Sequence, residues 1–476
     1  MTHAGTSERP TVLSIDAGSQ SVRAALFTVS GECLSAWHEP CAQTGDQAAV
    51  QQDPRAIIAA VKACLDHVTL QGEIQAAGIV SQGASAVCYR RADGSPLSPV
   101  ISWQDRRGEG YLNQLAMSAD EVHRRTGLPL SCHYGATKLR WCLEHLPEVA
   151  QAQRDNSLAA GPLMSLLLHH LCVERPVVVD AGSASRTQLW NLHDQRWDLD
   201  LAREFGVPTG VLPTGLGTCT RFGTLELTGR RIPVVFANRD QQAALFADGR
   251  PQVNTAYVNL GTGGFIQSLI PEPTGPRELL VNRVLSGPQV SEPLYSLEGT
   301  IHGAAGASPW LERRLGIAIV PQSLEDALAY NPPGDKTVYF LNGVMGMGSP
   351  YWRSRTLGQF SDGLTAQEKL LAWLESIVFM LLENLRIIER SAPVNQLWLS
   401  GGFSNLSGLI QRVADLSGKP CYCREDHEAT LRGAAFLAAG QPHSWRTAEP
   451  RAFWPAPNRG LKQRFEQWRT AMDRLP

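Results

Sequence analysis

The chain has 476 residues, of which 43% are hydrophobic and 18% charged, and its formal net charge is −2. This length favours two domains of about 200 or more residues each, with the composition of an ordinary globular protein. The charge balance gives no reason to expect a nucleic-acid partner. The ten cysteines show no zinc-binding spacing and no dense disulfide framework, which favours reduced thiols in a cytoplasmic protein.

Neither targeting nor membrane segments are expected. Residues 1–10 are polar and are interpreted as a flexible tail rather than a signal peptide. The most apolar window, 162–173, is interrupted by His169 and His170 and is too short to cross a bilayer. We therefore expect no membrane partner.

The N-terminal half begins with a predicted three-stranded meander at 11–16, 22–29 and 33–38. Its first turn is Gly18-Ser19-Gln20. Asp53-Pro54 begins an amphipathic helix. The predictions then continue with a strand at 76–81, a hairpin around 91–94, a mainly helical region at 109–175, and a buried strand at 231–237 followed by a helix from Gln241.

A second meander is predicted at 255–270, with its own turn at Gly261-Thr262-Gly263. Thr365 and Glu368 form a capping box at the start of a long helix that runs to about residue 391. After it come a strand at 396–400, a break at Gly401-Gly402, helices near 406–416 and 429–440, and an apolar helical face at Leu461, Phe465, Trp468, Met472 and Leu475.

The repeated order of meander and alternating helices and strands predicts an α/β protein with two duplicated, actin-like (ribonuclease H-like) domains. A Rossmann fold is disfavoured because its glycine fingerprint lies between a strand and a helix, whereas here the glycine turns lie between two strands. The expected domains are 11–240 and 241–440, followed by a tail at 441–476 with a packed helix. Phosphate groups are expected to bind in a cleft between the domains.

Both glycine turns suit phosphate binding because they can present backbone N–H groups and small hydroxyls to an anion. Asp16 closes the first strand next to one of them, where a carboxylate can hold Mg²⁺ through waters. An isolated Asp before Gly is more often plain turn chemistry. Arg23 follows on the next strand and points either to phosphates or to solvent.

Asp240 closes an apolar strand and precedes a helix. An isolated Asp at this position usually caps the helix N-terminus. The alternative is a general base that accepts the proton of an attacking hydroxyl during phosphoryl transfer. Its place between two phosphate-type turns favours the base.

Further motifs extend along nearly the whole chain in a fixed order. They are Asp16–Arg23, Gln82, Trp103–Arg107, Thr137–Trp141, Ala184–Thr187, Asn191–His193, Trp197–Asp198, Asp240–Phe246, Gly261–Gly263, Glu298–Thr300, Gly346–Trp352 and Gly401–Gly402. This ordered set resembles the FGGY carbohydrate kinases, with glycerol kinase as the nearest well-known branch but with a different sugar pocket.

The resemblance implies a role for each motif. Asp240 corresponds to the catalytic base and to a Mg²⁺-side carboxylate, and Asp16 to the Mg²⁺-associated carboxylate. The sugar-binding side corresponds to Gln82, Trp103, Asp105, His133, Asp240 and Gln241. The phosphate and adenine side corresponds to Gly18, Ser19, Gln20, Arg23, Gly261, Thr262, Gly263, Gly401, Gly402 and Asn405.

Three positions depart from the family pattern. Gly83 and Ala84 stand where glycerol kinases carry an Arg-Glu pair that grips glycerol. His133 stands where an aromatic ring is usual, which favours a more hydroxylated ligand. Arg239 replaces a glycine directly before the base, where a cation lowers the pKa of Asp240 unless it pairs elsewhere or binds an acidic group of the substrate.

The resulting hypothesis is a Mg²⁺-dependent kinase that transfers the γ-phosphoryl group of ATP to a primary hydroxyl of a small ketose or polyol. Two alternatives stay open: a glycerol kinase with a rebuilt pocket, and a catalytically weak sugar- or nucleotide-binding regulator. The sequence leaves a homodimer open as well.

Overall fold

A computed structural model describes residues 9–46, 48–288, 290–334, 336–353, 358–424 and 428–475. Most of the expected N-terminal tail, residues 1–8, lies outside this part of the chain. The described residues fall into two compact units. The first unit is drawn from Met1–Pro251, Asn282–Tyr295 and Glu428–Thr447, and the second from Gln252–Val281, Ser296–His427 and Ala448–Pro476.

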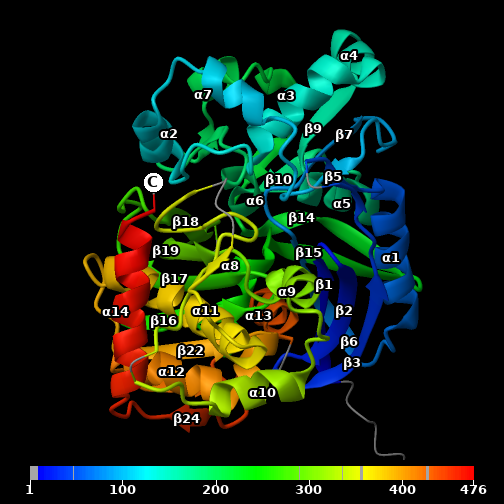
Figure 1. Cartoon of the computed structure of the whole chain (residues 1–476). Helices are drawn as coiled ribbons and strands as arrows, with labels where there is room; N and C mark the ends of the chain where they lie inside the picture. The colour runs from blue at the N-terminus through cyan, green and yellow to red at the C-terminus, as the bar shows by residue number, and fades with distance from the viewer. Residues whose placement is uncertain are drawn as a thin grey trace, which may run out of the picture. The chain divides into compact units, whose positions relative to one another are not determined.

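The first unit is built on a six-stranded sheet with the order β14-β15-β6-β1-β2-β3 (Figure 1). Strands β1, β2 and β3 form the predicted antiparallel meander, whereas β6 pairs parallel with β1, and β15 pairs parallel with β6. The strands span β1 Pro10–Ala17, β2 Ser21–Thr28, β3 Cys33–Pro40, β6 Glu73–Ser81, β14 Cys219–Leu227 and β15 Arg230–Arg239.

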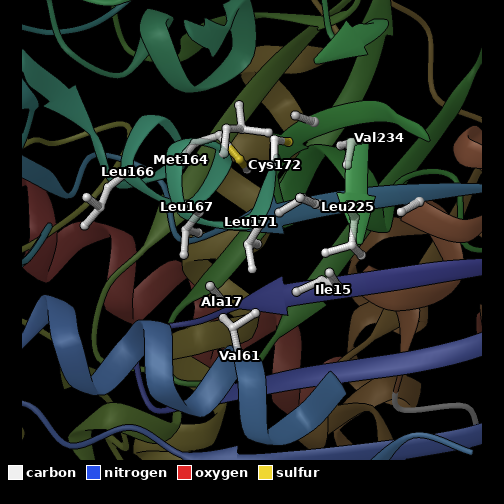
Figure 2. Packing of buried hydrophobic residues seen from close by; sticks show 14 of the residues in the cluster. Ile15, Ala17, Val61, Met164, Leu166, Leu167, Leu171, Cys172, Leu225 and Val234 are labelled. Atoms are coloured by element: carbon white, nitrogen blue, oxygen red, sulfur yellow. The ribbon is translucent and has the colours of Figure 1, made fainter. Parts of the chain in front are cut away.

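Helix α1 (Pro54–His67) begins where it was predicted, because the side chain of Asp53 accepts a hydrogen bond from the backbone N–H of Arg55. Its apolar face packs with α5 (Leu163–Leu171) in one continuous hydrophobic core. Figure 2 shows Leu167 and Leu171 from α5 beside Ala17 of β1 and Val61 of α1. This core holds β1 rigidly, so the residues at its carboxyl end are well positioned.

A second, smaller sheet in this unit has the order β4-β5-β8-β7-β9. Its strands are β4 Thr44–Gly45, β5 Val50–Gln52, β7 Ala86–Arg90, β8 Val100–Ile101 and β9 Leu158–Pro162. The helices predicted for 109–175 are present, with β9 inserted among them: η1 Glu109–Gln114, α2 Ala119–Thr126, α3 Gly135–His145, α4 Pro147–Arg154 and α5. A separate core of apolar residues joins α3 to this sheet.

Helix α13 (Ala429–Ala438) belongs to the first unit although it lies far along the sequence. It packs on β1, β6 and the short helix α8 (Asp240–Ala244). The approach is close: a Cβ added at Gly433 would lie 1.8 Å from the carbonyl oxygen of Ala243. The small residues of this helix therefore permit tight packing.

A sheet of order β18-β19-β17-β16-β22-β23-β24, most of whose strands lie in the second unit, repeats the strand arrangement of the first sheet (Figure 1). Strand β16 pairs antiparallel with β17 and parallel with β22, as β1 does with β2 and β6. The strands span β16 Thr255–Leu260, β17 Gly264–Ile270, β18 Leu280–Leu285, β19 Leu294–Ile301, β22 Gln396–Ser400, β23 Cys421–Cys423 and β24 Arg451–Phe453. The duplication predicted from the two glycine turns is thus visible in the strand pairing.

Helices α11 (Ala366–Ile388), α12 (Ser407–Ser417) and α14 (Arg459–Asp473) pack together in the second unit. The capping box of Thr365 and Glu368 is present as predicted. Leu461, Phe465, Trp468 and Met472 of α14 are buried, which confirms the apolar face predicted for this helix; Leu475 beyond it is only partly covered. None of the helices in the described residues is long and apolar enough to cross a membrane.

A buried ion-pair cluster fastens the three helices. Glu375 of α11 is fully buried and accepts hydrogen bonds from Arg412 of α12, at 3.1 Å, and from Arg464 of α14, at 2.7 and 2.6 Å. Removing one partner from such a cluster leaves buried charges without compensation.

We expect Glu375→Gln to destabilise the second unit by about 3–5 kcal/mol, because two buried arginines then lose their counter-charge. Urea unfolding followed by tryptophan fluorescence measures this loss. Glu466→Gln is the matched control, since Glu466 pairs with Arg469 on the exposed side of α14 and its loss should cost less than about 1 kcal/mol. Equal midpoints for Glu375→Gln and the wild type would contradict the role given to this cluster.

Candidate active site

Three parallel neighbouring strands in the first unit end at one edge of the sheet. Register pairs Asp16 of β1 with Val80 of β6, and Ser81 of β6 with Arg239 of β15. Asp16, Gln82 and Asp240 therefore leave the sheet side by side at its carboxyl edge. Ligands in sheets of this kind bind beyond the carboxyl ends of the strands.

Asp16 is fully buried and does not stabilise the glycine turn through its side chain. One carboxylate oxygen accepts a hydrogen bond from Arg23, its cross-strand neighbour, and the other has no hydrogen-bond partner. Burial raises the pKa of Asp16, and the guanidinium of Arg23 opposes this shift. A buried oxygen without a partner suits a divalent cation or its waters, so this residue fits Mg²⁺.

Arg23 has two carboxylate partners, Asp16 and Glu428, the second at 3.0 Å. Glu428 precedes α13 and has no motif around it, so sequence reasoning missed it. The Arg23 side chain keeps 28% of its surface exposed. Its charge therefore holds Asp16 in place, and part of the side chain remains accessible to a ligand.

Asp240 is the first residue of α8, whereas the sequence predicted that this helix begins at Gln241. Its carboxylate accepts the N–H of Gln241 at 2.7 Å, and Arg239 occupies the N-cap position, where it makes no side-chain capping bond. The simple helix-cap interpretation of Asp240 therefore does not describe its contacts.

The pKa of Asp240 is raised to about 7, first by burial and second by the negative charge of Asp16. Arg239 and Arg23 pull it down, but by less. The sequence predicted that Arg239 lowers the pKa of Asp240 and weakens it as a base. In the structure, the rise in this pKa caused by desolvation is larger than the decrease caused by Arg239. A carboxylate with this pKa can both accept and release a proton near neutral pH.

The side chains expected to bind sugar are linked to one another. The Gln82 amide donates to Gln52 at 2.7 Å and accepts from the Ser85 hydroxyl at 3.0 Å, and Ser85 in turn accepts the backbone N–H of Trp103 at 3.1 Å. The rings of Trp103 and His133 meet edge to face, with centroids 5.2 Å apart. Gln82, Trp103 and His133 therefore belong to one local assembly, in which Gln82 is largely engaged with protein groups.

Asp105 is buried and is bound by Arg107 through both its backbone N–H, at 3.0 Å, and its guanidinium, at 2.9 Å. Arg107 also stacks on Trp141, 4.3 Å from the ring centroid. Lys138, a buried lysine of α3, donates to the backbone carbonyls of Cys132, His133 and Tyr134. Its contacts fix the loop that carries His133, a role visible only in three dimensions.

The first glycine turn is closed by a hydrogen bond from the N–H of Gly18 to the carbonyl of Ser21, at 3.0 Å. The carbonyl of Ser19 accepts from Gln52, and that of Gln20 accepts from the N–H of Cys41. Gln52 thus connects this turn to Gln82, a link for which the sequence contains no signal.

The second unit brings together its own glycine segments. Gly261, Thr262 and Gly263 follow β16, while Gly401, Gly402 and Asn405 follow the neighbouring parallel strand β22. Gly401 has a φ of +88°, and a Cβ there would lie 2.6 Å from the carbonyl oxygen of Leu260, so only glycine fits. Gly402 and Asn405 are exposed.

The described residues contain no group of three or more His, Cys, Asp or Glu side chains that could hold a metal ion. Mg²⁺ in phosphoryl-transfer sites usually needs only one or two carboxylates, with waters and substrate phosphates completing its shell. Asp16 and Asp240 fit that requirement.

Two family models match nearly all of this chain. The N-terminal domain model of the FGGY family of carbohydrate kinases matches residues 11–247, and the C-terminal domain model matches residues 256–441. The chain belongs to the FGGY family of carbohydrate kinases. It is a phosphotransferase, and kinases of this family use ATP as co-substrate.

Individual relatives agree with this assignment. A glycerol kinase of Citrifermentans bemidjiense is 32% identical over 473 residues, which cover 96% of this chain and 94% of that protein. The fold resembles Plasmodium falciparum glycerol kinase with ADP, with a TM-score of 0.85 at 21% identity, covering 98% of both chains. It also resembles a xylulose kinase from Rhodospirillum rubrum, with a TM-score of 0.82 at 19% identity; the match covers 97% of this chain and 98% of that chain. The two-domain, actin-like fold predicted from the sequence is confirmed.

The raised pKa of Asp240 predicts a pH-dependent effect of Asp240→Asn on stability. Because the folded-state pKa lies above the unfolded value of 3.8, ionisation of Asp240 costs the fold stability as the pH rises toward about 7. The asparagine cannot ionise, so its stability advantage should grow by about 2–3 kcal/mol between about pH 5 and about pH 8. Urea unfolding of both proteins across this range measures the difference, and parallel stability curves would rule out a buried, high-pKa carboxyl group.

Proposed function

We propose that this kinase transfers the γ-phosphoryl group of ATP to a primary hydroxyl of a ketose or polyol larger than glycerol, with Asp240 as the general base. The observation that carries the proposal is the environment of Asp240. Its carboxyl group is desolvated, and burial together with the charge of Asp16 raises its pKa to about 7. It follows β15, the strand that pairs with β6, and Gln82 follows β6.

Phosphoryl transfer requires little covalent chemistry from the protein, so positioning and charge neutralisation provide most of the catalysis. Asp240 accepts the proton of the attacking hydroxyl as the oxygen approaches phosphorus. The N–H of Gln241 holds one carboxylate oxygen of Asp240 at 2.7 Å, which leaves the other oxygen for the substrate. Trp103, Asp105, His133 and Gln241 are proposed to shape the sugar side.

On the phosphate side, we assign Gly18, Ser19, Gln20, Arg23, Gly261, Thr262 and Gly263 to the phosphate oxygens and Gly401, Gly402 and Asn405 to the adenine. Asp16 would hold Mg²⁺ through its unpartnered oxygen, with Asp240 as the second carboxylate. When bound, Mg²⁺ neutralises charge on the transferred phosphoryl group. The domain limits that follow from the sequence, 11–240 and 241–440, and a cytoplasmic location remain part of the proposal.

The identity of the acceptor rests on Gly83 and Ala84. Neither side chain can hydrogen-bond to a small triol, and a site without such partners binds a polar ligand weakly. The matched relatives include glycerol kinases, which favours glycerol as the alternative acceptor. A catalytically weak sugar- or nucleotide-binding regulator has less support, because Arg239 does not depress the pKa of Asp240 below its ordinary value.

Asp240→Asn should reduce turnover by about 10²-fold or more with the best acceptor, because the amide keeps the size of the side chain but cannot accept a proton. In the wild type, kcat/KM should rise with pH through about 7, the pKa of Asp240. A coupled ADP-release assay over a panel of ketoses and polyols measures both. Turnover within a few-fold of the wild type, in a variant with an unchanged circular dichroism spectrum, would show that another group is the base.

Glycerol should have a kcat/KM lower by on the order of 10²-fold than the best larger acceptor, since two hydrogen-bonding side chains are missing. Restoring the two missing side chains at positions 83 and 84 also requires a change at Arg239. A Cβ at Gly83 would lie 2.8 Å from Cδ of Arg239, so Gly83→Arg alone should damage the site. Gly83→Arg with Ala84→Glu and Arg239→Gly should shift preference toward glycerol. If wild-type kcat/KM is highest with glycerol, the acceptor class proposed here is wrong.

A further inference from the structure

Lys138 lies near the start of α3 with its side chain buried in the protein. It is 1% exposed, and the helix begins at Gly135. Its ammonium nitrogen donates to three successive backbone carbonyls, those of Cys132 and Tyr134 at 3.3 Å each and that of His133 between them. In the described part of the chain, its hydrogen bonds go to these backbone oxygens and not to a carboxylate.

This position is unfavourable for a cation. The N-terminus of a helix carries a partial positive charge, and burial disfavours the charged form of an amine. Burial is the main reason why the pKa of Lys138 is lowered to about 7. The ionisable groups that act on the ammonium, directly or through a neighbour, are the Cys132 thiol and the Asp105 carboxyl group, which both raise this pKa, and beyond them Arg106, Arg107 and Glu109.

The number of N–H donors on Lys138 matches the number of carbonyls that it holds. A charged lysine has three N–H bonds, whereas a neutral lysine has two. All three carbonyls therefore keep their hydrogen bond to Lys138 only while the side chain is protonated. Deprotonation removes one of these bonds, and loss of a donor is unfavourable for a buried carbonyl.

The segment held by Lys138 carries one wall of the proposed sugar side. The ring of His133 meets the ring of Trp103 edge to face, with centroids 5.2 Å apart, and meets the ring of Tyr134 in the same way at 5.5 Å. The Ser131 hydroxyl accepts the backbone N–H of His133 at 3.2 Å. A shift of the carbonyls at 132–134 therefore moves the His133 ring relative to Trp103.

We propose that Lys138 is a positioning residue for the acceptor: its ammonium group gathers the carbonyls of residues 132–134 and thereby holds the His133 ring against Trp103 in the arrangement that binds the sugar. This inference rests on the proposed function, which places His133 and Trp103 on the sugar side. Lys138 acts through the loop and does not touch the acceptor. Because only the charged form supplies three donors, acceptor affinity should fall as Lys138 loses its proton.

The first experiment measures acceptor binding by calorimetry without nucleotide, from about pH 6 to about pH 9, on either side of the pKa of Lys138. The acceptor is the ketose or polyol with the highest kcat/KM in the wild type. Asp240→Asn is the parent protein, because Asp240 ionises in the same pH range. Lys138→Met keeps the length of the side chain without a donor, and Lys138→Arg stays charged. Lys62→Met, at an exposed lysine of α1, is the matched control.

We expect the dissociation constant of the Asp240→Asn parent to rise by about 10-fold or more from the lowest to the highest pH, because a buried carbonyl loses its donor. Adding Lys138→Met should weaken binding at every pH, and adding Lys138→Arg should remove the rise. Lys62→Met should match its parent. With Asp240 intact, Lys138→Met should raise the acceptor KM by about 10-fold and leave kcat within a few-fold. A purely structural role would instead lower kcat and the melting temperature and leave the pH dependence unchanged.

A second measurement reports the loop without any acceptor. The N–H groups of Gly135 and Ala136 donate to the carbonyls of Arg186 and Thr187, at 3.1 and 2.7 Å. Hydrogen exchange of these amides, corrected for its intrinsic pH dependence, rises when the loop opens locally. Exchange should be faster in Lys138→Met than in the wild type and in Lys62→Met. Equal exchange in all three proteins would show that Lys138 does not hold the loop.

Failure of this inference is distinguishable from failure of the proposed function. If the dissociation constant of the Asp240→Asn parent does not change with pH, or if Lys138→Met keeps the wild-type acceptor KM, the inference is overturned while the kinase proposal stands. If no ketose or polyol binds or is phosphorylated, the proposed function fails, and the exchange measurement alone decides whether Lys138 positions the loop.

Discussion

The parallel pairing of β1, β6 and β15 is the constraint on which the candidate site depends. It places the ends of three segments at one edge of a sheet, although more than sixty residues lie between the first and second ends and about 160 between the second and third. Asp16, Gln82 and Asp240 each follow directly from that pairing, because a strand fixed along its length by ladder hydrogen bonds also fixes the residue at its end. The core shared by β1, α1 and α5 prevents this edge from shifting.

Burial at that edge determines the chemistry of the carboxyl groups. Desolvation raises the pKa of both Asp16 and Asp240, and the negative charge of Asp16 raises that of Asp240 further. Arg23 opposes the effect at Asp16, and Arg239 opposes it at Asp240. Each carboxyl group therefore has an arginine beside it, but the two groups differ in their protonation. Asp16 is ion-paired with Arg23, whereas the pKa of Asp240 lies near neutral pH. Such a division suits one metal-side carboxylate and one base.

Duplication of the sheet extends to its glycine turns. Gly18 follows β1 in the first unit as Gly261 follows β16 in the second, and in each case a parallel neighbour, β6 or β22, ends beside the turn. The two copies have diverged at that neighbour. After β6 the chain carries Gln82 and the proposed sugar-side loop, whereas after β22 it carries Gly401, which packs closely on Leu260, and the exposed Gly402. The same scaffold thus presents a polar assembly in one unit and exposed backbone at Gly402 in the other, which fits the nucleotide side proposed for it.

Local sequence patterns predict the secondary-structure elements, and the order of the motifs predicts the family. The strand meanders, the capping box at Thr365 and the turns at Gly18 and Gly261 depend on neighbouring residues, so local patterns predict them. The motif order predicted the family, now confirmed by both domain models. Tertiary structure decided what depends on residues far apart: the contact of Arg23 with Glu428, the fit of Arg239 over Gly83, and the joining of α11, α12 and α14 through Glu375. It also decided the pKa of Asp240, because sequence shows the adjacent arginine but not the burial that outweighs it.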